Sequence, residues 1–151
     1  MTVMENAVRI EAPPERVWAA LASLEALERY DPGVKRSRKV SAEAEGLGAA
    51  RQCDLAPGGW FKERVVEWTP PRALAFELFE CTLPVRRLRH GYTLTAEAGG
   101  TVLRQRMEYE LKYGPIGRAM DALMVRAKWN AGIQGFLAGL KSYVEADGRS
   151  P

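Results

Sequence analysis

The sequence of 151 residues contains only two cysteines, Cys53 and Cys81, and a single histidine, His90. The cysteines form no C-x-x-C pair, so we expect reduced thiols in a cytoplasmic protein and no metal site. No apolar run approaches the length of a membrane span, and a strand-like pattern begins too early for a signal peptide. A nucleophile elbow, a phosphate-binding glycine loop and a dinucleotide fingerprint are also lacking, which argues against a cofactor-dependent enzyme.

The sequence also lacks a strong excess of charge of one sign, because the net charge is only +3 and the charged residues are interspersed. Nucleic-acid binding usually shows clustered basic residues, so we do not expect a nucleic-acid partner. With 46% apolar residues, the chain is long enough for one substantial core. We expect a single domain over residues 1–147 and a short tail over residues 148–151.

The longest predicted element is a helix from Gly114 to Ala146, which begins at Gly114-Pro115 and contains no further proline. At 100° per residue its apolar side chains form two faces, rotated by roughly a third of a turn from one another. The second-half face packs in a core, whereas the first-half face either lines a cavity or is ordinary core. That first-half face includes Met120, Leu123 and Met124.

Small residues also punctuate this helix, at Gly132, Gly135 and Gly139. Each glycine costs a helix roughly 1 kcal/mol relative to alanine. Close approach of another backbone, including that of a second subunit, would offset this cost, and simple tolerance is the alternative. A homodimer is therefore left open.

The remainder of the chain predicts one strand, two short helices and then a run of strands up to residue 113. Proline and an acid in the first turn open the first helix at residues 13–16, and Ser23 is a plausible N-cap for the second. The clearest strands flank Ala98-Gly99-Gly100 and alternate with period two, which indicates a hairpin. Its outer face carries exposed charges, with Arg89 opposite Glu108 or Glu110, and is interpreted as a solvated surface.

This order of elements resembles the helix-grip fold of the START-related (SRPBCC) superfamily, in its polyketide cyclase/dehydrase branch. The resemblance rests on Ala12–Leu21, Gly46–Arg51, Glu63–Leu74, Gly100–Val102 and Gly139–Tyr143. It implies an α+β fold in which a curved antiparallel sheet of about six to seven strands wraps around a long C-terminal helix. It also implies a cavity for a hydrophobic small molecule between the sheet and the helix, although the fold does not settle the function.

His90 lies on the predicted inward side of its strand, beside Met107 or Tyr109. An imidazole there is a candidate general acid or base, with Tyr92 as the other catalytic candidate, but a structural histidine is the alternative. Gln105 lies on the same side, where an unpaired amide would cost roughly 1–3 kcal/mol unless it has a partner or faces a wet cavity. The predicted ligand-binding set adds residues from the same hairpin and the helix, namely Gln105, Met107, Tyr109, Met120, Leu123 and Met124.

Arg51 and Glu63 lie on adjacent predicted strands. The resemblance implies that an arginine and a carboxylate in this region can orient a polyketide or its enolate. A two-residue turn at Gly58-Gly59 would place them on opposite faces and a longer loop on the same face, so a surface or structural ion pair remains the alternative. Trp60 and Tyr30 are predicted at the cavity rim, either as gate residues or as simple packing.

The leading functional hypothesis is binding of a lipid-, quinone- or polyketide-like molecule, without a cofactor. The first alternative is a cofactor-free cyclase, aromatase or dehydratase that uses the same pocket. The second is a co-chaperone-like interaction module. No stable membrane insertion is expected in any of the three.

Overall fold

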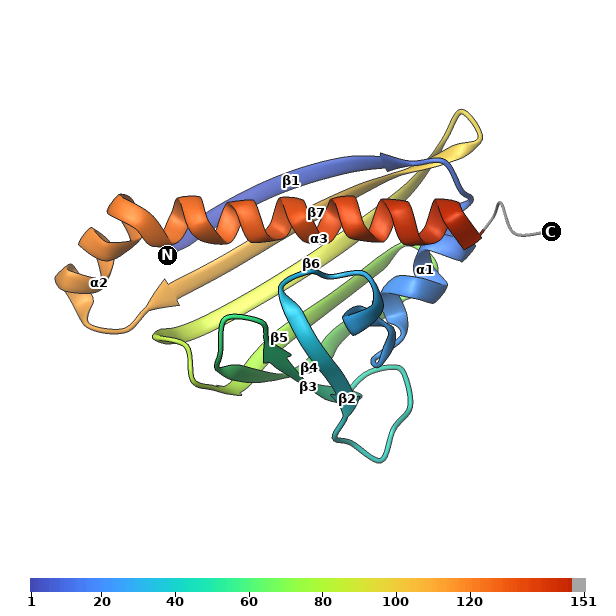
Figure 1. Cartoon of the computed structure of the whole chain (residues 1–151). Helices are drawn as coiled ribbons and strands as arrows, with labels where there is room; N and C mark the ends of the chain where they lie inside the picture. The colour runs from blue at the N-terminus through green and yellow to red at the C-terminus, as the bar shows by residue number, and fades with distance from the viewer. Residues whose placement is uncertain (148–151) are drawn as a thin grey trace.

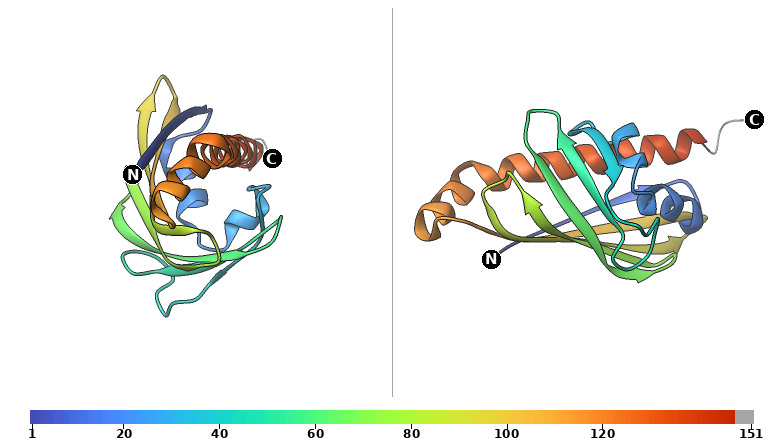
Figure 2. Two further views of the ribbon diagram at one scale, coloured as in Figure 1. Left: turned by 90° about the vertical axis from the view of Figure 1, so that its left-hand side faces the viewer. Right: turned by 90° about the horizontal axis from the view of Figure 1, so that it is seen from below.

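The computed structural model describes residues 1–147, so the predicted tail at residues 148–151 lies outside the described part of the chain. Seven strands form one antiparallel sheet in the order β1-β7-β6-β5-β4-β3-β2. The sheet curls around a long C-terminal helix, which crosses it from end to end (Figure 1). Figure 2 shows the same arrangement along the helix, with the sheet curving beneath it. The predicted α+β helix-grip architecture is confirmed.

The element boundaries follow the predicted order of strand, short helices, meander and long helix. They are β1 (Thr2–Ile10), α1 (Pro14–Ala22), the 3-10 helix η1 (Ala26–Arg29), β2 (Val34–Lys39), β3 (Ala50–Leu55), β4 (Trp60–Thr69), β5 (Ala73–Cys81), β6 (Val85–Glu97), β7 (Gly100–Leu111), α2 (Gly114–Met120), the π turn η2 (Asp121–Val125) and α3 (Arg126–Asp147).

The first helix packs through its apolar side against α3 and the strands β6 and β7. Pro14 opens α1, and Val17 and Leu21 are buried in the core. Trp18 meets the indole of Trp68 on β4 edge to face, with ring centroids 5.1 Å apart. The Ser23 hydroxyl then accepts a hydrogen bond from the Ala26 amide at 3.3 Å, but η1 begins later than predicted and its N-cap residue is Glu25.

The hairpin of β6 and β7 has the predicted register. Arg89 lies opposite Glu108, and His90 lies opposite Met107. The Arg89 guanidinium nevertheless pairs with Glu67 on β4, at 3.2 Å, rather than with its cross-strand neighbour. Such exposed pairs contribute at most about 1 kcal/mol each, so they do not determine the fold.

The long C-terminal helix extends without a break from Gly114 to Asp147, as predicted, but it contains a π turn that the sequence did not indicate. A π turn at Asp121–Val125 separates α2 from α3. A π turn inserts about one extra residue into the helical repeat, and one residue corresponds to a rotation of about 100°. This rotation sets which side of the first half faces the sheet, and that side is not the apolar one.

The prediction that the first-half face lines a cavity or the core is wrong for most of that face, including Ile116, which is 69% exposed. Leu123 and Met124 are 84% and 63% exposed, and only Met120 packs partly against the core. The residues that this segment buries are instead Gly117, Asp121 and Val125, at intervals of four. The spacing of apolar residues in the sequence therefore identified an apolar face that exists. The prediction was that this face points inward, whereas it points to solvent.

The glycines of α3 differ in their surroundings. A Cβ on Gly139 would overlap the carbonyl oxygen of Tyr30, whereas a Cβ on Gly132 would meet nothing within 4 Å. Gly139 therefore permits the close approach of another backbone, which is the chain's own segment after η1 and not a second subunit. At Gly132 no neighbour requires a glycine, so the helix simply tolerates the cost of this residue.

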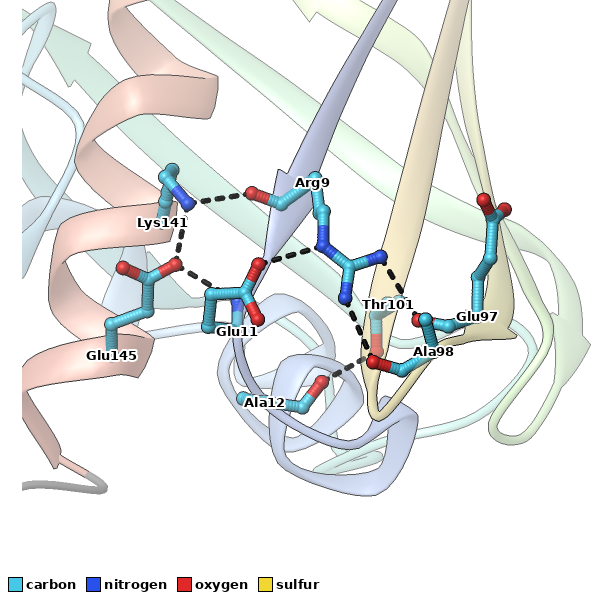
Figure 3. A network of polar contacts seen from close by, with 8 residues as sticks. All are labelled: Arg9, Glu11, Ala12, Glu97, Ala98, Thr101, Lys141 and Glu145. Atoms are coloured by element: carbon cyan, nitrogen blue, oxygen red, sulfur yellow. Dashed lines mark hydrogen bonds and ion pairs between the residues drawn. The ribbon is translucent and has the colours of Figure 1, made fainter.

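A polar network joins the C-terminal half of α3 to the end of β1 and the β6–β7 turn (Figure 3). Lys141 donates to the Arg9 carbonyl at 2.7 Å, and Arg9 in turn donates to the carbonyls of Glu97 and Ala98. Glu145 accepts from Lys141 and from the amide of Glu11. These contacts hold the helix against the sheet at this end of the molecule.

Candidate functional site

Arg51 and Glu63 meet inside the fold. A four-residue connection, 56–59, joins β3 to β4, and its length sets a register in which Arg51 lies directly opposite Glu63. Directly opposed residues point to the same face of a sheet. The longer-loop alternative is therefore correct, and the two residues do not form a surface ion pair.

The ion pair is almost completely removed from solvent, with side-chain exposures of 4% for Arg51 and 0% for Glu63. Two guanidinium nitrogens of Arg51, Nε and Nη2, donate to the same oxygen, Glu63 Oε2, at 3.2 and 3.0 Å. The other carboxylate oxygen remains available to a second partner.

His90 is that second partner. Its Nε2 lies 2.8 Å from Glu63 Oε1, and its Nδ1 lies 2.9 Å from the hydroxyl of Tyr92. A carboxylate only accepts hydrogen bonds, so Nε2 carries a proton. In the neutral imidazole Nδ1 accepts the Tyr92 hydroxyl proton, and in the imidazolium it donates to the hydroxyl oxygen. A continuous hydrogen-bonded path thus runs from Glu63 through His90 to Tyr92.

Phe76 on β5 supports two members of this path. Its ring stacks on His90 with centroids 5.3 Å apart, and the guanidinium carbon of Arg51 lies 4.4 Å from its centroid. Phe76 is itself fully buried. A guanidinium that loses water contacts on a ring face gains electrostatic attraction from the ring, which favours keeping Arg51 charged in this position.

The electrostatics of the site keep Glu63 ionised and Tyr92 protonated. Burial opposes the charge on Glu63, but the charges and hydrogen bonds of His90 and Arg51 outweigh it and lower its pKa to about 2. Burial and the nearby carboxylate raise the pKa of Tyr92 well above its usual value. Burial likewise raises the pKa of Cys53 to about 12, so this thiol remains neutral beside Arg51.

Three buried polar atoms have no hydrogen-bond partner within the described part of the chain. They are Nη1 of Arg51, the hydroxyl of Tyr30 and Oε1 of Gln105. Tyr30 was predicted at a cavity rim, but it is only 7% exposed and lies inside the fold. Gln105 is 2% exposed, which excludes the alternative that a sheet edge exposes it. Unpartnered buried atoms are rare in folded proteins and call for a partner, such as a ligand or a water.

Aromatic rings connect Tyr30 to the hydrogen-bonded path. Phe136 of α3 lies between the two tyrosines, with centroid distances of 5.7 Å to Tyr30 and 5.7 Å to Tyr92. Tyr143 is the other ring beside Tyr30, at 5.3 Å. The site is therefore bounded by α3 on one side and by the inner face of β3–β6 on the other.

The other predicted site residues lie in different surroundings. Met107 is half-buried opposite His90, and Trp60 is half-buried with the Lys62 ammonium 5.5 Å from its ring centroid. Tyr109 is fully buried, but its hydroxyl donates to Asp121 and so is already engaged. Met120 packs against the core, whereas Leu123 and Met124 point to solvent, away from this site.

A hollow of about 530 Å³ lies over the outer face of the sheet. Its lining includes Gly91 together with Arg89, Thr93, Arg104 and Arg106, which alternate with inward-facing residues along β6 and β7. Arginines and glutamates are mixed around it, in agreement with the solvated surface predicted there.

Sequence reasoning did not identify Phe76, Phe136 or Asp121 as part of any site. Both phenylalanines look like ordinary core residues in a sequence. Asp121 had a recognisable signal, because it is the only acid between residues 111 and 144.

Neither a metal centre nor a membrane-spanning helix is found in residues 1–147. No three His, Cys, Asp or Glu side chains of this range gather as a set of metal ligands. None of the described helices is long and apolar enough to cross a membrane.

Comparison with known proteins gives a family match over nearly the whole chain. A family model described as polyketide cyclase / dehydrase and lipid transport matches residues 1–145. An uncharacterized protein of Mycobacterium tuberculosis (strain H37Rv) is 29% identical over 146 residues, which are 95% of this chain and 85% of the relative.

Solved structures share the fold. TTHA0849 from Thermus thermophilus has a TM-score of 0.83 at 23% identity, covering 97% of this chain and 99% of its own. Ara h 8.0201 has a TM-score of 0.77 at 13% identity, covering 96% and 98%. CV1439 from Chromobacterium violaceum has a TM-score of 0.72 at 23% identity, covering 95% and 96%.

Proposed function

The chain belongs to the polyketide cyclase / dehydrase and lipid transport family, and from this premise we propose that it binds a hydrophobic or aromatic small molecule between the sheet and the C-terminal helix. The ligand carries an oxygen that accepts hydrogen bonds. It places this oxygen at Arg51 and Tyr30 and covers apolar side chains on the inner face of the sheet.

The observation that carries this proposal is the unpartnered Nη1 of Arg51. This nitrogen is a charged donor in a side chain that is 4% exposed, and the hydroxyl of Tyr30 is also buried without a partner. A buried donor left unsatisfied costs roughly 1–3 kcal/mol, and more when charged. A carbonyl, enolate or phenolate oxygen of a ligand would satisfy both groups and remove this cost.

Half-buried apolar side chains adjoin the polar atoms and supply the rest of the surface. Phe61 precedes Glu63 by two residues on β4, Leu78 lies opposite Glu63, and Met107 lies opposite His90. All three pack only partly against the core. Covering their remaining apolar surface would contribute roughly 25 cal/mol per Å² to binding.

Native mass spectrometry of the purified protein, followed by solvent extraction, is the direct test for a bound compound. A matched pair of fluorescent probes then tests the polar contact. Anilinonaphthalene sulfonate and N-phenylnaphthylamine share an aromatic frame, and only the first carries an anionic oxygen group. We expect both probes to bind the protein, the sulfonate more tightly.

The variant Tyr30→Phe tests the contact without disturbing the packing, because the deleted hydroxyl has no partner in the free protein. We expect it to weaken binding of the sulfonate by about three- to tenfold while leaving the neutral probe unchanged. Tyr143→Phe, on the neighbouring ring, is the matched control. No extracted compound and no binding of either probe would contradict the proposal. Equal binding of the sulfonate by Tyr30→Phe and the unmodified protein would contradict the polar contact alone.

A second candidate function, a cofactor-free cyclase or dehydratase, is favoured by the path from Glu63 through His90 to Tyr92. Tyr92 keeps its proton, so it would act as a general acid toward a ligand carbonyl, and His90 would restore that proton. Tyr92→Phe removes the acid but keeps the ring against Phe136. If turnover of an enolisable polyketide-like substrate occurs, we expect this variant to lose about 10²- to 10⁴-fold in kcat. Unchanged turnover would exclude this role for Tyr92.

A further inference from the structure

The segment formed by α2 and η2 has three of its five large apolar side chains on the outside. Its buried positions are Gly117, Asp121 and Val125, while Ile116, Leu123 and Met124 are 69%, 84% and 63% exposed. An ordinary surface helix shows the opposite arrangement, with apolar residues inward and charged residues outward. Three large exposed apolar residues within nine positions form a patch that scattered surface residues do not explain.

The orientation of this segment is fixed by contacts of the buried aspartate. The carboxylate of Asp121 accepts hydrogen bonds from the hydroxyls of Tyr109 and Thr2, the latter at 2.6 Å, and it pairs with Arg126 at 3.1 Å. Tyr109 lies on β7 and Thr2 on β1, so the turn is fastened to two neighbouring strands. A simple rotation that buried Leu123 and Met124 would break these bonds.

The exposed charges of this segment have one sign, and the neighbouring acid Glu110 is paired with Arg86 and Arg87. Lys112, Arg118, Arg126 and Lys128 are all exposed, and the sole acid from residue 111 to residue 144 is the buried Asp121. The segment also lies at one end of the molecule, beyond the end of β7 (Figure 1). The apolar patch is therefore accessible to a large flat partner, and its surroundings carry a net positive charge.

We propose that the face formed by Ile116, Leu123 and Met124, with its neighbouring lysines and arginines, docks reversibly on an anionic lipid bilayer. Apolar side chains next to Lys and Arg are the combination that binds the interface of a negatively charged membrane. The side chains enter the headgroup region without any element crossing the bilayer. This proposal rests on the surface of α2 and η2 alone and stands independently of ligand binding between the sheet and α3.

Co-sedimentation with vesicles tests the proposal on the full chain. Vesicles of equal parts phosphatidylcholine and phosphatidylglycerol are compared with vesicles of phosphatidylcholine alone. We expect the partition coefficient to be at least about tenfold higher on the anionic vesicles and to fall with added salt.

Two double variants separate the contributions of apolar surface and charge. We expect L123S/M124S and R118E/K128E each to lose binding by at least about tenfold, because both alter the docking face at exposed positions. Leu47→Ser, at a residue that is 65% exposed on another surface, is the matched control and retains binding. Circular dichroism confirms that each variant is folded.

Failure of the unmodified protein to bind anionic vesicles would overturn the proposal, as would unchanged binding by L123S/M124S. Light scattering measures the oligomeric state and so tests whether a second copy of the chain covers this face. A dimer that L123S/M124S converts to a monomer, without vesicle binding, would show that a second copy of the chain covers this face instead.

Discussion

Glu63 shows how a single buried carboxylate keeps its charge in this fold. Its two oxygens have separate partners, with Arg51 on one and His90 on the other. Burial penalises the ionised form, and the two partners more than compensate for that penalty. The result is a group whose protonation is linked to folding.

Acid pH should therefore destabilise the protein through Glu63. Its pKa in the folded state is about 2, below the ordinary value of 4.5, so its stabilising contribution is complete above pH 4.5 and is lost as the pH falls toward 2. The lost contribution is on the order of 3 kcal/mol. Urea unfolding measured across this pH window should show a steeper decrease in the free energy of unfolding for the unmodified protein than for Glu63→Gln. Parallel pH profiles would contradict the linkage.

The site residues differ in how far sequence alone could place them. His90, Tyr92 and Gln105 follow from strict alternation along two strands joined by a glycine turn, because period-two patterning determines the face. Arg51 and Glu63 do not, because one residue more or less in the 56–59 connection reverses the face. Their pairing became visible only with the register of β3 and β4.

At the scale of elements, the C-terminal helix illustrates a second limit. Its length and its two offset apolar faces follow from spacing, but the direction in which each face points does not. Spacing cannot distinguish a face that packs inward from one that points outward, and the hydrogen bonds that Asp121 accepts from β1 and β7 are not visible in the sequence. For this reason spacing alone predicts that Leu123 and Met124 point inward, whereas both point to solvent.

Two glycines in α3 provide a matched test of its packing. Gly139→Ala would push a methyl group into the Tyr30 carbonyl, and we expect it to lower the free energy of unfolding by about 1–3 kcal/mol. Gly132→Ala adds the same methyl group in open space and should raise it by up to about 1 kcal/mol, because alanine favours the helix. Thermal and urea unfolding measure both. Equal effects at the two positions would show that Tyr30 does not pack closely on α3.

At the scale of the whole molecule, packing is uneven along the C-terminal helix. The half beyond Ile133 is buried through four large apolar side chains and is held by the polar network of Lys141 and Glu145 (Figure 3). The half before Val125 buries a glycine and an aspartate. Local opening requires least free energy where few apolar contacts are lost.

Hydrogen exchange should follow this difference. We expect amides of α2 and η2 to exchange at least about tenfold faster than those of α3 beyond Ile133, with β6 and β7 among the slowest segments. The strands β6 and β7 lie inside the sheet and are paired on both sides. Mass-spectrometric exchange on the full chain resolves these segments. Equally slow exchange in α2 would mean that the contacts of Asp121 stabilise it as much as an apolar core does.

The ion pair of Arg51 and Glu63, extended by His90, also has a consequence for how this sequence can change over time. Loss of one partner from a buried charge pair costs about 3–5 kcal/mol, whereas exchange of the whole set for apolar residues can be neutral. A lineage that alters one member first passes through a poorly folded ancestor. Arg51, Glu63 and His90 are therefore expected to be inherited as a unit, retained together in some descendants of this gene and replaced together in others.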